Sequence, residues 1–204
     1  MSQIKLSQRT KIIALFCAFA AGALVMVTAV TMLVGNPAPR VTSTGTAAVG
    51  GPFRLVDQTG APVTEAALKG KPSLIFFGFT HCPDVCPTAL FEMSEILTAL
   101  GPDAGKAQVF FVTVDPERDT PDALKSYLSS FAPQIRGLTG SPEAVDAIKK
   151  EYRVYSRKVP LTGGDYTMDH TAVVYLMGKD GTFVAPFNSK RPPAEAAAEL
   201  KRYF

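Results

Sequence analysis

The chain has 204 residues, 47% of them hydrophobic, and a formal net charge of +3. This length predicts one folded domain with accessory segments. The excess positive charge comes from Lys5, Arg9 and Lys11, which precede the first acidic residue. The rest of the chain has equal numbers of acidic and basic residues, so the pI near 8.7 does not indicate a nucleic-acid partner.

Residues 12–34 form a run of 23 positions without a charged side chain. As a helix, this run extends for roughly 34 Å, which is enough to cross a bilayer core. The basic residues precede it, so the positive-inside rule predicts the tail 1–11 in the cytoplasm and the rest of the chain on the far side. A cleaved signal peptide is the alternative, but its apolar region is usually shorter. We expect an uncleaved transmembrane anchor, and both interpretations export the domain.

Residues 35–51 are rich in Pro, Gly, Ser and Thr, which predicts a flexible linker, and the folded domain is expected at 52–204. The alternation of apolar runs with capping and breaking residues predicts an α/β sheet covered on both faces. The expected strands are 53–57, 73–79, 108–114, 153–159, 171–177 and 182–187, and the expected helices are 87–100, 121–131, 142–151 and 193–203.

The stretch from Gly78 to Pro87 reads GFTHCPDVCP and follows a strongly apolar strand. It holds Cys82 and Cys86, whereas the third cysteine, Cys17, lies in the apolar run 12–34 and reads as a small apolar residue. A disulfide between such close positions would close a very small loop, so redox chemistry or metal binding explains the pair better than a structural role.

Two prolines predict the conformation of this stretch. Cys82 and Cys86 each precede a proline, which disfavours helical angles, so we expect both cysteines on a loop. Pro87 suits the first position of a helix and places Cys86 at about the N-cap. There the helix dipole and the free backbone N–H groups favour the Cys86 thiolate, which is both a nucleophile and a ligand for soft metals.

The chain contains two histidines. His81 adjoins Cys82, so its side chain is expected to point away from the thiol, as a surface or capping residue. His170 precedes the expected strand 171–177 and either meets the cysteine loop or is a satisfied histidine at a strand end. Two thiolates and one imidazole suit zinc or copper, and copper fits three ligands better because structural zinc sites have four.

Three blocks together resemble the Sco family of copper-binding cytochrome oxidase assembly factors. They are GFTHCPDVCP from Gly78 to Pro87, VDPERDT from Val114 to Thr120, and DHT from Asp169 to Thr171. Their order and spacing match the family from about Pro52 to the C-terminus, and the N-terminal apolar segment matches its single membrane anchor.

The resemblance implies a thioredoxin-like fold with one copper, as copper(I) or copper(II), bound by Cys82, Cys86 and His170. It also implies a reversible disulfide between the two cysteines. Asp115 matches a loop acid that tunes the site, and its alternative role is a loop cap with Arg118. Asp84 lies in the matching loop, where hydrogen bonding of the turn is the simpler role.

The family's function implies a metallochaperone for the dinuclear copper site in subunit II of cytochrome c oxidase. Its expected partners are that subunit, another periplasmic copper chaperone and a thioredoxin-like reductant, and its expected location is a bacterial inner membrane with the domain in the periplasm. The alternative is a thiol–disulfide oxidoreductase that reduces the cysteines of subunit II and needs Cys82 and Cys86 but not His170. A peroxidase-like activity is the third hypothesis. The C-x3-C spacing, and a histidine where thioredoxins carry a cis-proline, favour metal capture.

Overall fold

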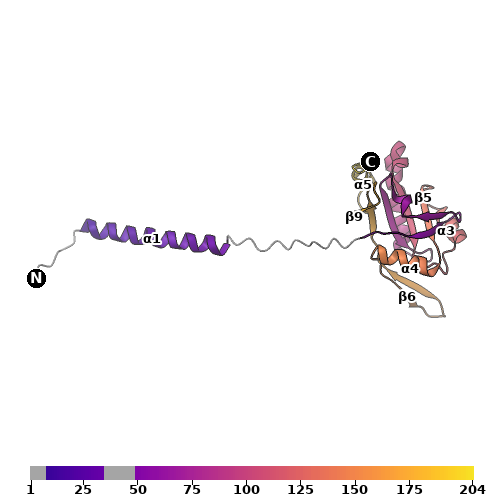
Figure 1. Ribbon diagram of the computed structural model, residues 1–204, viewed down its shortest axis with the longest axis horizontal. Helices are drawn as coiled ribbons and strands as arrows, with labels where there is room; N and C mark the ends of the chain where they lie inside the picture. The colour runs from indigo at the N-terminus through magenta and orange to yellow at the C-terminus, as the bar shows by residue number, and fades with distance from the viewer. Residues whose placement is uncertain (1–7, 35–48) are drawn as a thin grey trace, which may run out of the picture. The chain divides into compact units, whose positions relative to one another are not determined.

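The computed structural model describes residues 8–34 and 49–204 (Figure 1). The chain divides into two units, residues 1–46 and residues 47–204. The described part of the first unit is helix α1 (Gln8–Val34). Within the described ranges, no helix reaches the combination of length and hydropathy that a membrane span requires. Positions 1–7 of the expected tail and 35–48 of the expected linker lie outside the described residues.

The second unit alternates strands with helices and two short 3-10 helices. In chain order its elements are β1 (Arg54–Asp57), β2 (Pro62–Thr64), η1 (Glu65–Leu68), β3 (Ser73–Gly78), α2 (Val85–Leu100), η2 (Gly101–Lys106), β4 (Gln108–Thr113), α3 (Pro121–Leu128), β5 (Ile135–Thr139), α4 (Pro142–Glu151), β6 (Ser156–Pro160), β7 (Tyr166–His170), β8 (Val174–Met177), β9 (Phe183–Phe187) and α5 (Pro193–Lys201).

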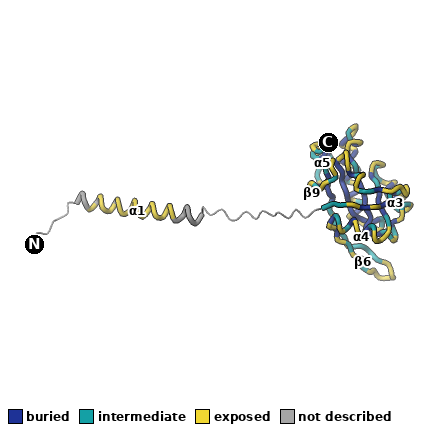
Figure 2. Tube along the Cα trace, in the orientation of Figure 1, coloured by how far each residue is buried: buried dark blue, intermediate teal, exposed yellow. Residues whose placement is uncertain are grey.

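Seven of these strands form one sheet in the order β2-β1-β5-β4-β3-β8-β9. At its centre, β3 runs parallel to β4 and antiparallel to β8, so the sheet is mixed. Every residue of β3 is buried, as expected for a strand covered on both faces, and Figure 2 shows the buried residues gathered inside this unit. The expected α/β fold, with a central sheet flanked by helices, is confirmed.

The sequence analysis missed two strands of this sheet, β2 and β5. In β5, Gly137 interrupts the apolar pattern, and an internal glycine weakens a strand prediction. The glycine is required by packing, because a Cβ atom at this position would lie 2.6 Å from Cδ1 of Leu128 in α3. The helix can therefore approach the sheet closely only where the strand has no side chain.

Helix α2 begins two residues earlier than expected. Its N-cap is Asp84 and its first residue is Val85, so Cys86 lies in the first turn and not on the loop. Pro87 is tolerated there because the first turn of a helix leaves its N–H groups without helical partners. The expected apolar face is confirmed, since all four of its members are buried: Leu90, Met93, Leu97 and Leu100.

The expected strand 171–177 is also shorter than predicted, because the sheet strand β8 begins only at Val174. His170 belongs instead to β7, which pairs with β6 in a separate two-stranded hairpin. The hairpin carries the β6 label in Figure 1 and projects from the edge of the unit. His170 is the last residue of β7, so the hairpin determines where the imidazole lies.

Candidate metal centre

The two loops that carry the first two sequence blocks follow two parallel strands, β3 and β4, which end side by side. Gly78, the last residue of β3, pairs with Thr113, the last residue of β4. The cysteine loop follows β3, and the acidic loop from Asp115 to Asp119 follows β4. A hydrogen bond from Val114 N to Gly78 O (2.8 Å) extends the pairing one residue past the end of β4. The sheet therefore brings the first two sequence blocks together.

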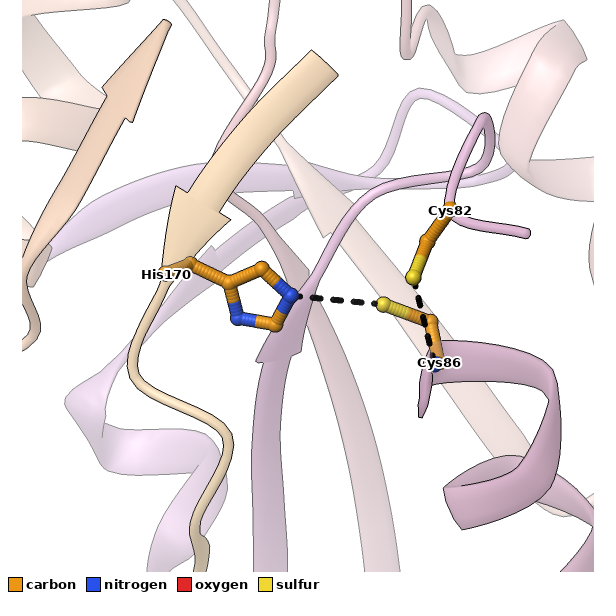
Figure 3. A group of neighbouring side chains, drawn as sticks. All are labelled: Cys82, Cys86 and His170. Carbon is orange, nitrogen blue, oxygen red and sulfur yellow. Dashed lines mark hydrogen bonds between the residues drawn. The ribbon is translucent and has the colours of Figure 1, made fainter. Parts of the chain in front are cut away.

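The hairpin brings the third block to the same place. One donor atom each from Cys82, Cys86 and His170 can be chosen so that all three lie within 4.8 Å of one another. The Nε2 atom of His170 lies 3.5 Å from the Sγ atom of Cys86, and Figure 3 shows the imidazole pointing at this sulfur from the end of β7. This is the group of cysteine and histidine side chains that the sequence analysis singled out.

Three contacts fix the orientation of the His170 ring. Its Nδ1 atom lies 3.1 Å from the carbonyl oxygen of Thr171. A carbonyl can only accept, so Nδ1 carries the proton, and in the neutral ring Nε2 keeps its lone pair toward Cys86. The rings of Phe79 and Phe76 meet the imidazole edge to face, at centroid distances of 5.7 and 6.2 Å. Burial lowers the pKa of His170, which favours the neutral, ligating form.

The two thiols differ in their surroundings. Cys86 is fully buried, and this burial raises the pKa of its thiol, contrary to the expected preference for a thiolate. The backbone N–H of Cys86, at the start of α2, donates a hydrogen bond to Sγ of Cys82 (3.4 Å). Cys82 is half-buried and thus the more accessible thiol.

The buried carboxylate of Asp119 anchors the start of the cysteine loop through hydrogen bonds. It accepts hydrogen bonds from the hydroxyl of Thr80 (2.6 Å), the N–H of Thr80 (3.1 Å) and the hydroxyl of Thr113 (2.6 Å). Burial raises the pKa of this carboxyl group, although the threonine hydrogen bonds oppose the shift. Sequence analysis did not assign Asp119 a role, although its position after a buried strand was a usable signal.

Asp115 is fully buried and contacts other residues of the acidic loop and the hairpin. Its Oδ2 accepts from Nε of Arg118 (2.5 Å), and its Oδ1 accepts from the hydroxyl of Tyr166 (2.8 Å). Nη1 of Arg118 donates to the carbonyl oxygen of Tyr166 (2.9 Å). Asp115 is thus outside the group of three donor atoms, and the expected cap with Arg118 is present.

The other candidate residues lie outside the group as well. His81 is exposed, with Nδ1 3.0 Å from the hydroxyl of Thr80. Asp84 is exposed, makes no side-chain cap to α2, and lines a groove of about 560 Å³ between the start of α2 and the segment after His170. Cys17 lies in α1 and is exposed.

This donor set supports two kinds of chemistry. Two sulfurs and a neutral imidazole nitrogen are ligands for zinc and for copper, and the thiols need only lose their protons to bind. The two thiols can also release two protons and two electrons to form a disulfide, because their sulfur atoms lie within 4.8 Å of each other.

A family model described as SCO1/SenC matches residues 41–204. Among curated proteins, an Arabidopsis thaliana protein named "SCO1 homolog 1, mitochondrial" is 43% identical over 143 residues, which is 70% of this chain and 43% of the relative. A mouse protein named "SCO1 homolog, mitochondrial" is 40% identical over 161 residues, 78% of this chain and 57% of the relative. The chain thus spans about half the length of these curated relatives.

Solved structures are similar over the same part of the chain. Bradyrhizobium japonicum ScoI with copper bound is 62% identical, with a TM-score of 0.76, and the match covers 77% of this chain and 100% of that one. Yeast Sco1 with copper bound is 40% identical, with a TM-score of 0.69, and the match covers 76% of this chain and 88% of that one.

Proposed function

We propose, from the premise that this chain belongs to the SCO1/SenC family, that it binds one copper ion through Cys82, Cys86 and His170 and acts in the assembly of cytochrome c oxidase. The observation that carries this proposal is the approach of Nε2 of His170 to Sγ of Cys86, within a group whose donor atoms lie within 4.8 Å. The copper named in the descriptions of the similar ScoI and Sco1 structures supports the choice of metal.

The donor set itself favours copper over zinc. Thiolates select copper(I), and imidazole suits both copper states. A closed zinc site requires four protein ligands, and among the described residues the group consists of three. Cys86 is fully buried and His170 is half-buried, and this partial exclusion of water suits an oxidation-sensitive ion.

In the cell, we infer that the chain delivers this copper to the dinuclear site in subunit II of cytochrome c oxidase. A periplasmic copper chaperone would load it, and a thioredoxin-like reductant would keep its cysteines reduced. Residues 12–34 would anchor it in a bacterial inner membrane, with residues 35–51 as linker and residues 52–204 in the periplasm, as the uncharged apolar run suggests. A reporter enzyme that is active only outside the cytoplasm, fused after Phe204, tests this orientation.

The second candidate function is reduction of the cysteines of subunit II. The half-buried thiol of Cys82 favours it, because a partner disulfide can reach this sulfur. Attack by the Cys82 thiolate would form a mixed disulfide and release one partner thiol. Cys86 would then displace the second partner thiol and leave a Cys82–Cys86 disulfide, so that two electrons pass to the partner. This reaction does not require His170.

The first experiment is copper(I) stoichiometry on the full-length protein, reduced and loaded without oxygen in detergent, beside His170→Ala and Cys82→Ser variants. We expect one tightly held copper(I) per chain, with weaker binding in both variants. Wild-type protein without tight copper binding, but with rapid exchange between its cysteine pair and dithiols, would instead support the reductase function.

A cellular experiment separates the same two functions. We expect His170→Ala to impair oxidase assembly under copper limitation and to leave dithiol exchange intact, because the imidazole is a ligand and not a thiol. Normal oxidase activity in that strain under copper limitation would contradict the copper function.

A further inference from the structure

No strand of the seven-stranded sheet pairs with the β6–β7 hairpin, so side-chain contacts attach the hairpin to the rest of the unit. Its strands pair with each other and belong to a sheet separate from the seven-stranded one. None of the ten residues in these two strands is fully buried. A segment with little buried apolar surface belongs to the less stable part of a fold. The position of His170, at the end of this hairpin, therefore depends on specific contacts.

A cluster of these contacts comes from the loop after β4. The guanidinium of Arg118 lies 3.8 Å from the ring centroid of Tyr166, the first residue of β7. It also donates from Nη1 to the carbonyl oxygen of Tyr166 (2.9 Å) and from Nε to Asp115 (2.5 Å). The hydroxyl of Tyr166 donates to the other oxygen of Asp115 (2.8 Å). We call Asp115, Arg118 and Tyr166 the hairpin latch.

The latch is linked to His170 by two routes. Along β7, residues two apart share a face, so Tyr166, Met168 and His170 all lie on one side, and about 13 Å of strand joins the latch to the imidazole. Across space, the ring of Phe79 lies 5.9 Å from Cζ of Arg118 and 5.7 Å from the ring of His170. One aromatic side chain therefore separates the latch from the ligand.

The cysteines are held by a different set of contacts. The threonine hydrogen bonds of Asp119 fasten the loop that carries Cys82, and Cys86 is fixed in the first turn of α2. Neither arrangement includes a residue of the hairpin. Loss of the latch should therefore move the imidazole and leave the two thiols in place.

We propose that Arg118, together with Asp115 and Tyr166, positions His170 beside the cysteines, so that the latch determines whether the centre has three ligands or is a dithiol alone. This inference rests on the proposed copper function, in which His170 is a ligand. It gives Asp115 an effect on the centre through Arg118 and Tyr166, without contact with the ion.

The test is Arg118→Lys in the full-length protein. Lysine keeps a positive charge beside the buried Asp115. It lacks the planar guanidinium group that stacks on the ring of Tyr166 and donates a hydrogen bond to the Tyr166 carbonyl oxygen. We expect copper(I) affinity to fall by about ten- to hundredfold, the range for residues that orient a metal ligand. The exchange rate of the Cys82–Cys86 disulfide with dithiothreitol should not change. In the copper(II) form, nitrogen hyperfine coupling in the EPR spectrum should weaken.

The matched control is Arg136→Lys. Arg136 also pairs with a carboxylate, Asp57 (2.9 Å), and lies over the ring of Phe110 (5.6 Å), but it belongs to β5 and does not contact the hairpin latch. We expect this variant to bind copper(I) as the wild type does. Tyr166→Phe, which keeps the ring and removes only the hydroxyl, is the milder second variant if Arg118→Lys folds poorly.

A double variant distinguishes an effect on the position of His170 from a general loss of folded structure. In a His170→Ala background, Arg118→Lys should cause no further loss of copper affinity. An unchanged affinity in the single variant, or an equal loss in both backgrounds, would overturn the proposal. If the wild type binds no copper, the copper function fails, but the latch is still tested by NMR. Contacts between the His170 and Phe79 rings should then weaken in Arg118→Lys, and undiminished contacts contradict the latch.

Discussion

The Nε2 atom of His170 lies 3.5 Å from Sγ of Cys86, although 84 positions separate the two residues in the sequence. One comes from a hairpin outside the main sheet, and the other from the first turn of a helix that follows the central strand β3. The contact therefore depends on two structural elements that do not pair with each other. This dependence makes the centre sensitive to changes in the side chains that support it.

The first prediction concerns the reactivity of the two thiols. Iodoacetamide should modify Cys82 at least about tenfold faster than Cys86 in the reduced protein, because Cys86 is fully buried and burial raises the pKa of its thiol. Mass spectrometry of quenched samples gives both rates. Unfolding in urea is the control and should equalise them. Equal rates in the folded protein would contradict the burial of Cys86.

The second prediction concerns Gly78 at the end of β3. A Cβ atom there would lie 2.8 Å from Sγ of Cys86 and 2.7 Å from Cε2 of Phe111, so a methyl group cannot fit without displacing the thiol. We expect Gly78→Ala to reduce the free energy of unfolding by about 1–3 kcal/mol, the usual cost of overpacking, and to weaken copper binding. Urea denaturation and copper titration measure the two effects.

Gly105→Ala is the matched control for this substitution. Gly105 lies in η2, and apart from its chain neighbours and the backbone of its own helix, no atom of the described residues comes within 4 Å of a Cβ atom built at its position. This variant should retain the stability and the copper affinity of the wild type. A Gly78→Ala protein that behaves in the same way would show that the neighbouring side chains yield freely.

The third prediction concerns Asp119, which holds the cysteine loop through Thr80. Asn offers only one acceptor oxygen, so Asp119→Asn should leave a buried threonine hydroxyl without its acceptor and reduce the free energy of unfolding by about 1–3 kcal/mol. The double variant with Thr80→Val should be less destabilised than the sum of the single variants, because the two side chains share a hydrogen bond. Strict additivity would argue against the shared bond.

The control for Asp119→Asn is Asp122→Asn in the first turn of α3. Asp122 is exposed, so its carboxylate contributes only through the helix dipole, and the expected loss is below about 1 kcal/mol. Urea denaturation of both variants under the same conditions separates the buried network from a general effect of losing a negative charge.

The fourth prediction is a pH dependence from Asp57. Burial opposes ionisation of this carboxyl group, but hydrogen bonds from Thr59, Arg136 and Ala61 outweigh it and lower its pKa from 3.8 to about 2. The unfolded chain therefore takes up this proton at higher pH than the folded protein does. The free energy of unfolding should fall as the pH decreases from 3.8 to about 2 through this group.

The matching variant is Asp57→Asn. It should be less stable than the wild type at neutral pH, and the difference should shrink as the pH falls through this range, because protonation removes the same interactions from the wild type. Denaturant titrations at several pH values measure the difference. A gap that stays constant with pH would mean that the charge of Asp57 does not stabilise the folded state.

The amino-acid sequence was sufficient to predict the elements whose signals are local. The apolar run 73–79 predicted the buried central strand, and Ser141 followed by Pro142 predicted the start of α4, where the Ser141 side chain accepts from Ala144 N. The apolar spacing of α2 predicted its buried face. These signals are local because burial on both faces, or on one helical stripe, leaves a pattern in consecutive residues.

Strands β5 and β7 needed the tertiary structure, whereas the expected strand 153–159 overlaps β6 (Ser156–Pro160). The pattern of β5 is broken by Gly137, whose purpose is visible only where Leu128 packs on it. The strands of the hairpin contain no fully buried residue, so they have little hydrophobic pattern, and the sequence analysis placed His170 just before a sheet strand instead of at the end of β7. A glycine or a polar strand is informative only once its neighbours are known.

For the candidate centre, the sequence by itself determined which side chains are the candidate ligands, because the cysteine pair is a local motif and His170 is one of only two histidines. The tertiary structure alone decided the surroundings of these side chains. It buried Cys86, turned Nε2 of His170 toward it, and joined Asp115 to the hairpin through Arg118 and Tyr166. The reason is physical: residue types and turns are encoded locally, whereas burial and ligand geometry arise from contacts between distant segments.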